Sequence, residues 1–127
     1  MMRLATVFLM IFAGGAAAQG LDVPIHEMAG DGQAATCGIS EVSGLKPGGD
    51  GFLALRSGPG AKYRKLGELH NGDRVTEIER RGDWVGIAVS KAGVKERDLC
   101  GNNGPKRQIT GRGLGWVHGN WLKYLYP

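Results

Sequence analysis

The sequence predicts an all-β fold, a small and partly open barrel of about five strands to which an N-terminal extension is tied by a disulfide bond. Apolar residues alternate with other residues over short stretches, and glycine-containing turns separate these stretches at short intervals. No segment of the 127 residues has a sustained helical period. We expect a single packed domain over residues 52–127, with a long loop at 90–113.

Residues 1–18 have the features of a signal peptide. A short basic start at residues 1–3 precedes an apolar run from Leu4 to about Phe12, and the small residues Ala16–Ala18 suit signal peptidase. The run is shorter than the roughly 20 residues that cross a bilayer, so we expect cleavage after Ala18 and no stable membrane insertion. The first cysteine lies too far downstream to carry a lipid anchor. These features predict a periplasmic or secreted protein.

Residues 19–51 are expected to form a flexible leader and linker. The part from Gln19 to about Thr36 is rich in glycine and alanine and has little periodicity. A short strand is predicted over Cys37–Val42, and residues 43–51 form a glycine-rich connection. The packed unit is therefore expected to begin at Phe52.

The first half of the barrel contains two predicted arms. A strand over Phe52–Arg56 ends at the turn Ser57–Gly60, where glycine and proline interrupt the apolar pattern. Residues Tyr63–Leu69 form a loop arm or an irregular strand. The dipeptide Asn71-Gly72 that follows is typical of a tight turn.

A hairpin is predicted from the strands Arg74–Arg80 and Trp84–Val89. Val75 and Ile78 break strict alternation, and a bulge or a strong twist would allow both to be buried. In the second strand every other residue is expected to face the core, and Trp84 the opposite side. The core-facing residues are Val85, Ile87 and Val89.

The chain then enters the long polar loop at 90–113 and returns to the barrel. A strand over Gly115–Val117, a short helical turn over Gly119–Leu122 and a final stretch over Lys123–Tyr126 are expected. A loop of this length in so small a domain is usually functional, tethered or disordered. We expect it to be tethered.

The tether is predicted from the two cysteines, Cys37 and Cys100. An isolated pair in an exported chain normally forms a disulfide. The alternative, a reactive or metal-bound thiol, is less favoured because neither cysteine belongs to a CxxC pair or has a histidine within a few residues. Closing a loop of roughly 60 residues would stabilise the fold by about 4 kcal/mol on the chain-entropy model.

Composition and motifs argue against several functional classes. The formal net charge is +4, and the basic residues are spread along the chain without a dense run, so a nucleic-acid partner is not expected. The sequence contains neither GxSxG nor HExxH. His26, His70 and His118 have no spacing that suggests a shared metal ion. We therefore expect no catalytic residues, no cofactor and no metal site.

From Phe52 to Leu122 the sequence resembles a bacterial Src-homology-3 domain, a small barrel found in exported cell-wall and envelope proteins. Five pieces in order carry the resemblance, and they are Leu55–Gly60, Tyr63 with Leu66–Leu69, Asn71–Val75, Gly82–Val85, and Gly115–His118 followed by Trp121-Leu122. The resemblance implies a partly open barrel of about five strands that binds short peptides, wall material or a protein. The long loop at 90–113 departs from the family, which usually has a short hairpin there.

Aromatic side chains are the best candidates for the binding surface, because they give a large contact area at low entropic cost. The four candidates are Tyr63, Trp84, Trp116 and Trp121. Trp84 and Tyr63 are expected at the surface, whereas core and surface positions stay open for Trp116 and Trp121 because a small domain needs its large residues for burial.

Three functions are compatible with this sequence. The first is a binding module for peptidoglycan peptides or an envelope protein, through the face around Tyr63 and Trp84. The second is a structural or inhibitory accessory protein whose tethered loop caps a partner enzyme. The third, least favoured, is a small wall hydrolase.

Overall fold

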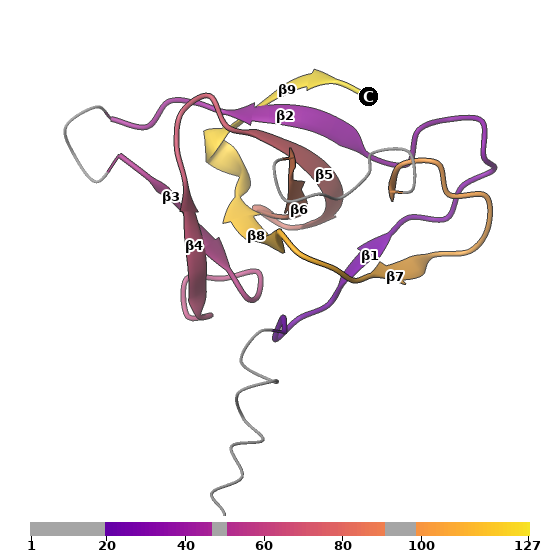
Figure 1. Ribbon diagram of the computed structural model, residues 1–127, viewed down its shortest axis with the longest axis horizontal. Helices are drawn as coiled ribbons and strands as arrows, with labels where there is room; N and C mark the ends of the chain where they lie inside the picture. The colour runs from indigo at the N-terminus through magenta and orange to yellow at the C-terminus, as the bar shows by residue number, and fades with distance from the viewer. Residues whose placement is uncertain (1–19, 47–50, 91–98) are drawn as a thin grey trace, which may run out of the picture.

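The computed structural model describes residues 20–46, 51–90 and 99–127, and over these residues the chain is almost entirely β (Figure 1). The predicted signal peptide lies outside the described residues, as do positions 47–50 and 91–98. The elements are β1 (Ile25–Glu27), β2 (Gly38–Val42), β3 (Leu53–Arg56), β4 (Lys65–Leu69), β5 (Arg74–Arg81), β6 (Trp84–Val89), β7 (Arg107–Ile109), β8 (Leu114–His118), the 3-10 helix η2 (Gly119–Trp121) and β9 (Leu122–Tyr126).

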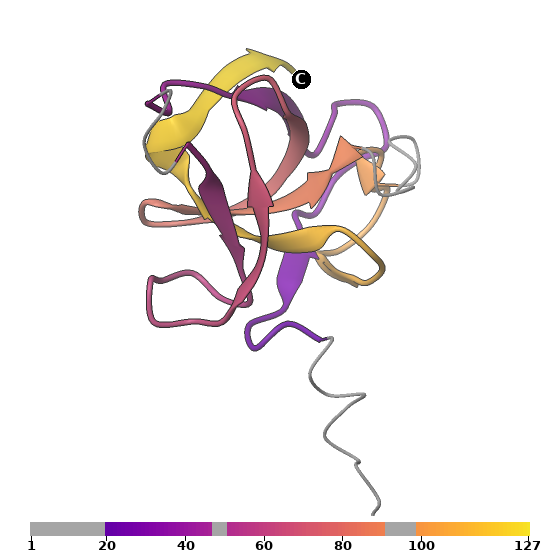
Figure 2. The same ribbon diagram turned by 60° about the vertical axis from the view of Figure 1, so that its left-hand side comes forward.

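Seven strands form one curved antiparallel sheet in the order β4-β3-β8-β6-β5-β2-β9. Its outermost strands, β4 and β9, do not pair with each other in the described part of the chain, so the barrel is open (Figure 2). This confirms the predicted all-β, partly open barrel. The sheet exceeds the expected five strands because β2 inserts between β5 and β9.

The hairpin β5–β6 carries the predicted bulge. The register of the pair shifts between Glu77 and Glu79, which leaves Ile78 opposite no partner. Both Val75 and Ile78 are buried, but they face opposite sides of the sheet, as alternation over three residues requires. Val75 therefore belongs to the core inside the barrel and Ile78 to the core on the outer face.

The first hydrophobic core fills the inside of the barrel. It gathers aliphatic side chains from most strands of the large sheet, with the connection after β2 closing one end. Its buried members are Val42, Leu45, Leu53, Leu55, Leu69, Val75, Val85, Ile87 and Val117. Val85 and Ile87 are thus placed as the alternation of β6 predicts.

A second hydrophobic core covers the outer face of the sheet. The segment before β2 and the loop after β6 pack there, and β1 pairs with β7 in a separate two-stranded sheet (Figure 1). The buried members are Ile25, Ile78, Ala88, Leu99, Leu114 and Trp116. Gly86 allows Ile25 this approach, because a Cβ at Gly86 would lie 2.9 Å from Ile25 Cγ1.

The expectation of a flexible leader is therefore wrong for its described part. Ile25 and Glu27 are fully buried, and β2 lies inside the large sheet rather than in a linker. The packed unit begins well before Phe52. Sequence pattern could not reveal this, because β1 has only three residues and its partner strand lies about 80 positions away.

Cys37 and Cys100 form a disulfide, as predicted. Backbone hydrogen bonds flank it, with Thr36 N–H donating to the carbonyl of Cys100 at 3.1 Å and Gly30 N–H to that of Gly104 at 3.0 Å. The buried amide of Asn102 donates to the carbonyl of Met28 at 2.8 Å. The bond therefore lies within a packed contact between two segments that are distant in sequence.

The carboxylate of Glu27 is buried in this contact and has two partners. Arg107 Nη2 lies 2.7 Å from Glu27 Oε1, and the hydroxyl of Thr36 donates to Glu27 Oε2. A buried charge is tolerated only when it is paired and hydrogen-bonded in this way. The contact fixes the position of β7 against β1.

Candidate functional site

An open pocket of about 310 Å³ lies at the end of the barrel where β6 begins and β8 ends. Aromatic and aliphatic side chains line it, together with one arginine and one histidine. The lining residues are Phe52, Leu53, Ala54, Arg56, Ala61, Trp84, His118 and Trp121. Two of the four predicted binding residues, Trp84 and Trp121, meet in this aromatic pocket.

Trp84 and His118 face each other across neighbouring strands. Their Cα atoms are register partners, and their rings meet edge to face with centroids 5.4 Å apart and an interplanar angle of 71°. Edge-to-face packing is the arrangement that aromatic pairs prefer. The pair therefore holds the ring of Trp84 at the pocket, where the side chain is half-buried.

His118 also determines where Trp121 lies. His118 Nδ1 accepts a hydrogen bond of 3.2 Å from the backbone N–H of Asn120, which caps the 3-10 helix η2. That helix carries Trp121 to the pocket, and its first residue is fixed by a 2.7 Å bond from Gly119 N–H to the carbonyl of Asp83. Trp121 is 38% exposed, the exposure expected of a contact residue.

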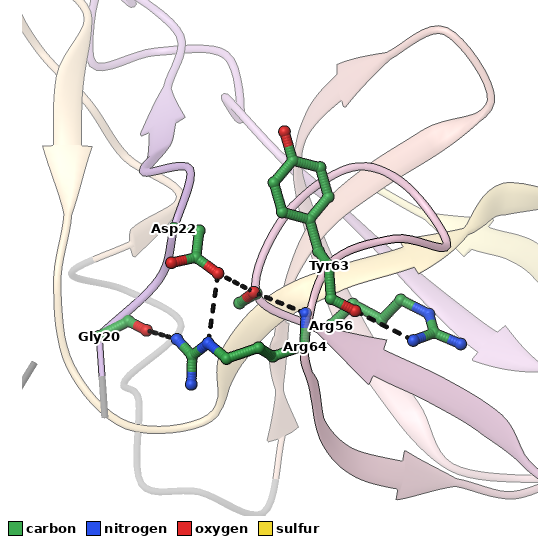
Figure 3. Close-up of polar contacts among 6 residues, drawn as sticks. Gly20, Asp22, Arg56, Tyr63 and Arg64 are labelled. Atoms are coloured by element: carbon green, nitrogen blue, oxygen red, sulfur yellow. Dashed lines mark hydrogen bonds and ion pairs between the residues drawn. The ribbon is translucent and has the colours of Figure 1, made fainter. Parts of the chain in front are cut away.

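Arg56 supplies a positive charge at the pocket. It is the last residue of β3, and its Nη1 donates a 3.1 Å hydrogen bond to the carbonyl of Tyr63 (Figure 3). A second cation, Lys65 Nζ, lies 4.2 Å from the centroid of the Phe52 ring and pairs with Glu68. None of the residues that the structure describes at this pocket has an acidic side chain. Its chemistry is aromatic and basic.

Tyr63 does not line the pocket. Its ring packs on its own loop, since a Cβ built at Gly58 would lie 2.5 Å from Tyr63 Cδ1. The side chain is half-buried, and its ring points away from the hydrogen bond that its backbone carbonyl accepts from Arg56 (Figure 3). What Tyr63 contributes to the pocket is the carbonyl that orients Arg56.

Trp116 is part of the second core and not of a surface. The side chain is fully buried, and its indole N–H donates a 2.9 Å hydrogen bond to the carbonyl of Val23. This excludes Trp116 from direct ligand contact. The sequence left its position open because nothing in it indicates that the N-terminal segment covers this face of the sheet.

A polar cluster ties that N-terminal segment to the loop after β3. The hydroxyl of Ser57 donates to Asp22 Oδ2 at 2.5 Å, and Arg64 Nε lies 3.2 Å from the same oxygen (Figure 3). The hydrogen bond from Ser57 lowers the pKa of Asp22, with Arg64 adding to the effect. Since Arg64 follows Tyr63 directly, this cluster fixes the loop that presents the Tyr63 carbonyl to Arg56.

The sequence pattern does not indicate the other lining residues, of which Phe52, Arg56 and His118 have the side chains best suited to contact a ligand. Arg56 and His118 belong to motifs of the family resemblance, where the pattern explains them as strand residues. An arginine directly before the Ser57–Gly60 turn was the available signal, because a charged residue beside aromatic positions is a common feature of binding surfaces.

Other kinds of site find no support in the described ranges 20–46, 51–90 and 99–127. Within them no group of three or more histidine, cysteine, aspartate or glutamate side chains could hold a metal ion. Within the same ranges, no helix has the length and apolar character needed to cross a membrane. The aromatic pocket is the place where two of the four predicted binding residues, Trp84 and Trp121, meet.

Comparison with known families agrees with the fold. The model of the bacterial SH3 domain matches residues 51–123, which is more than half of the chain. The chain therefore belongs to the bacterial SH3 domain family, whose members are commonly binding modules. No curated protein and no solved structure matches the sequence.

Proposed function

We propose that this member of the bacterial SH3 domain family is an exported, non-catalytic binding module that recognises cell-wall peptides of peptidoglycan through the aromatic pocket. The observation that carries the proposal is the convergence of Phe52, Trp84 and Trp121 with Arg56 at one pocket, none of whose described lining residues is acidic. Aromatic anchors and an arginine are the groups that most often dominate binding energy at protein surfaces.

The size of the pocket supports a small ligand or the end of a peptide. Its volume of about 310 Å³ is at the lower end of the range for small-molecule sites. Short peptides present an apolar side chain and polar backbone groups side by side. Such a ligand would use both the aromatic walls and the charged rim.

Export is the second part of the proposal. A disulfide persists in oxidising compartments outside the cytoplasm, and this protein has one. Membership of the bacterial SH3 domain family is compatible with that location. The signal peptide and its cleavage after Ala18 remain predictions. The intact mass of the protein purified from its native envelope fraction would test them, because cleavage makes Gln19 the first residue.

The direct test of wall binding is co-sedimentation with purified wall sacculi. We expect the protein to sediment with them and Trp84→Ala to stay in solution. Tyr126→Ala is the matched control, because Tyr126 is 47% exposed and does not line the aromatic pocket. Retention of Trp84→Ala at the wild-type level would overturn the role of the pocket. If the wild type does not sediment with sacculi but captures an envelope protein, the ligand of the pocket is a protein partner and not the wall.

A further inference from the structure

We propose that Arg56 binds a carboxylate of the ligand, so that the pocket recognises a short peptide by its free C-terminal α-carboxyl group. The inference rests on the proposed function in taking the aromatic pocket as the binding site. It adds the chemical group that is recognised and the residue that recognises it.

The guanidinium of Arg56 is held in place before any ligand arrives. Nη1 donates to the carbonyl of Tyr63 at 3.1 Å, and the loop that carries this carbonyl is fixed by the bonds among Asp22, Ser57 and Arg64. An arginine restrained in this way loses less side-chain entropy on binding. Its remaining N–H groups can pair with a planar carboxylate.

Arg56 has no carboxylate partner among the residues that the structure describes. Neighbouring basic side chains differ, since Arg80 pairs with Glu77, Arg81 with Glu79 and Lys65 with Glu68. An arginine that faces an aromatic pocket without a counter-ion is a site of positive potential. None of the described residues that line the pocket is acidic, so among them an anionic group meets no opposing charge.

His118 lines the same pocket, and its Nδ1 accepts a hydrogen bond from the backbone of Asn120, so in the neutral ring the proton is on Nε2. We expect the carboxylate to pair with Arg56, while the small apolar side chain that precedes it contacts the aromatic lining formed by Trp84 and Trp121.

The test uses two probes that differ only at the C-terminus, acetyl-Ala-Ala and its amide, each in the L and the D form. Tryptophan fluorescence of the full mature chain measures binding. We expect at least one of the two acids to bind ten-fold or more tightly than its own amide. The comparison of L and D forms separates peptidoglycan-like ends from ordinary protein ends.

Three variants complete the test. Arg56→Gln should bind acid and amide equally, and Arg56→Lys should keep part of the preference because it keeps the charge. Arg112→Gln is the control, because it removes one positive charge just as Arg56→Gln does. Arg112 lies shortly before the first residue of β8 and does not line the aromatic pocket. Circular dichroism checks that each variant keeps the fold.

The outcomes separate this inference from the proposed function. Equal binding of acid and amide by the wild type, or an unchanged preference in Arg56→Gln, would overturn the inference. The inference would also be overturned if the protein sediments with sacculi in a Trp84-dependent way but binds neither the acid nor the amide. A preference that depends on Arg56, in a protein that ignores sacculi, would support the inference and overturn the wall as the target.

Discussion

Trp84, Trp116 and Trp121 lie in three different environments, and their roles follow from those environments. Trp84 is half-buried at the pocket, Trp121 is 38% exposed beside it, and Trp116 is fully buried under the N-terminal segment. Substitutions at these sites should therefore separate binding from stability.

Trp116→Phe should destabilise the protein. The smaller ring leaves part of its site empty and removes the N–H that donates to the Val23 carbonyl. The free energy of unfolding should fall by about 2 to 3 kcal/mol. Urea unfolding measures this, with Trp121→Phe as the matched surface control. An equal effect of the two substitutions would contradict the buried role of Trp116.

Glu79 connects the protonation of one carboxylate to the docking of β1. Its burial raises the pKa, but the backbone N–H of His26 at 2.8 Å and the hydrogen bond and charge of Arg81 outweigh that effect. The pKa of the folded state is thus below the ordinary value. Such a group stabilises the fold at pH values above its unfolded pKa.

Acidification should remove this stabilisation. The contribution of Glu79 is complete above the unfolded pKa of about 4.3 and disappears as the pH falls through the lower folded pKa. Urea unfolding of the wild type and of Glu79→Gln, from about pH 6 to about pH 3, should show a smaller loss in the variant. If the free energies of unfolding of the two proteins fall in parallel with pH, the protonation of Glu79 is not linked to folding.

At the scale of elements, the strands with strong local patterns were predictable. The predicted and observed limits of β6 are the same, and the break in alternation at Val75 and Ile78 indicated a bulge or a strong twist in β5, where the register shifts between Glu77 and Glu79. The strands β1 and β7 were not predictable, because each has three residues and is stabilised by a partner distant in sequence.

Gly86→Ala tests the docking of β1 on the outer face of the sheet. The new Cβ would lie 2.9 Å from Ile25 Cγ1, and a β-branched side chain has few rotamers with which to move away. The free energy of unfolding should fall by about 1 to 3 kcal/mol. Gly67→Ala is the control, because nothing lies within 4 Å of its Cβ position. Equal stability of the two variants would show that β1 does not pack against Gly86.

At the scale of the whole molecule, the large sheet has a core on each face, and the small sheet of β1 and β7 lies over the outer one. The inner core is the barrel, and the outer core exists because the N-terminal segment and the loop after β6 are joined by the disulfide. Pairing of the two cysteines was predictable from composition and compartment. The outer core was not, since its members come from segments whose contacts are all long-range.

Removing the disulfide should destabilise the whole fold. The double variant Cys37→Ser, Cys100→Ser loses a bond that closes 63 residues, which corresponds to about 4 kcal/mol on the chain-entropy model. Thermal unfolding measures the change, and thiol titration of the denatured wild type should find no free thiol. Two titratable thiols, or an unchanged melting temperature, would contradict the tether.

The residues of the candidate site were predictable only in part. Trp84 and Trp121 stand in motifs that carry the family resemblance, so the sequence predicts them as binding residues. The role proposed for Arg56 depends on its hydrogen bond to the Tyr63 carbonyl and on a pocket whose described lining includes no acidic side chain, and both are properties of the folded chain.

The central claim is that Trp84 and Trp121 form the binding surface and Trp116 does not. The most direct test is a titration of the ¹⁵N-labelled protein with soluble peptidoglycan fragments, followed through the indole N–H signals of its three tryptophans. Single Trp→Phe substitutions assign the signals. We predict that the signals of Trp84 and Trp121 shift in a saturable way while that of Trp116 stays in place. A shift of the Trp116 signal alone, or no shift of the other two, would contradict the account.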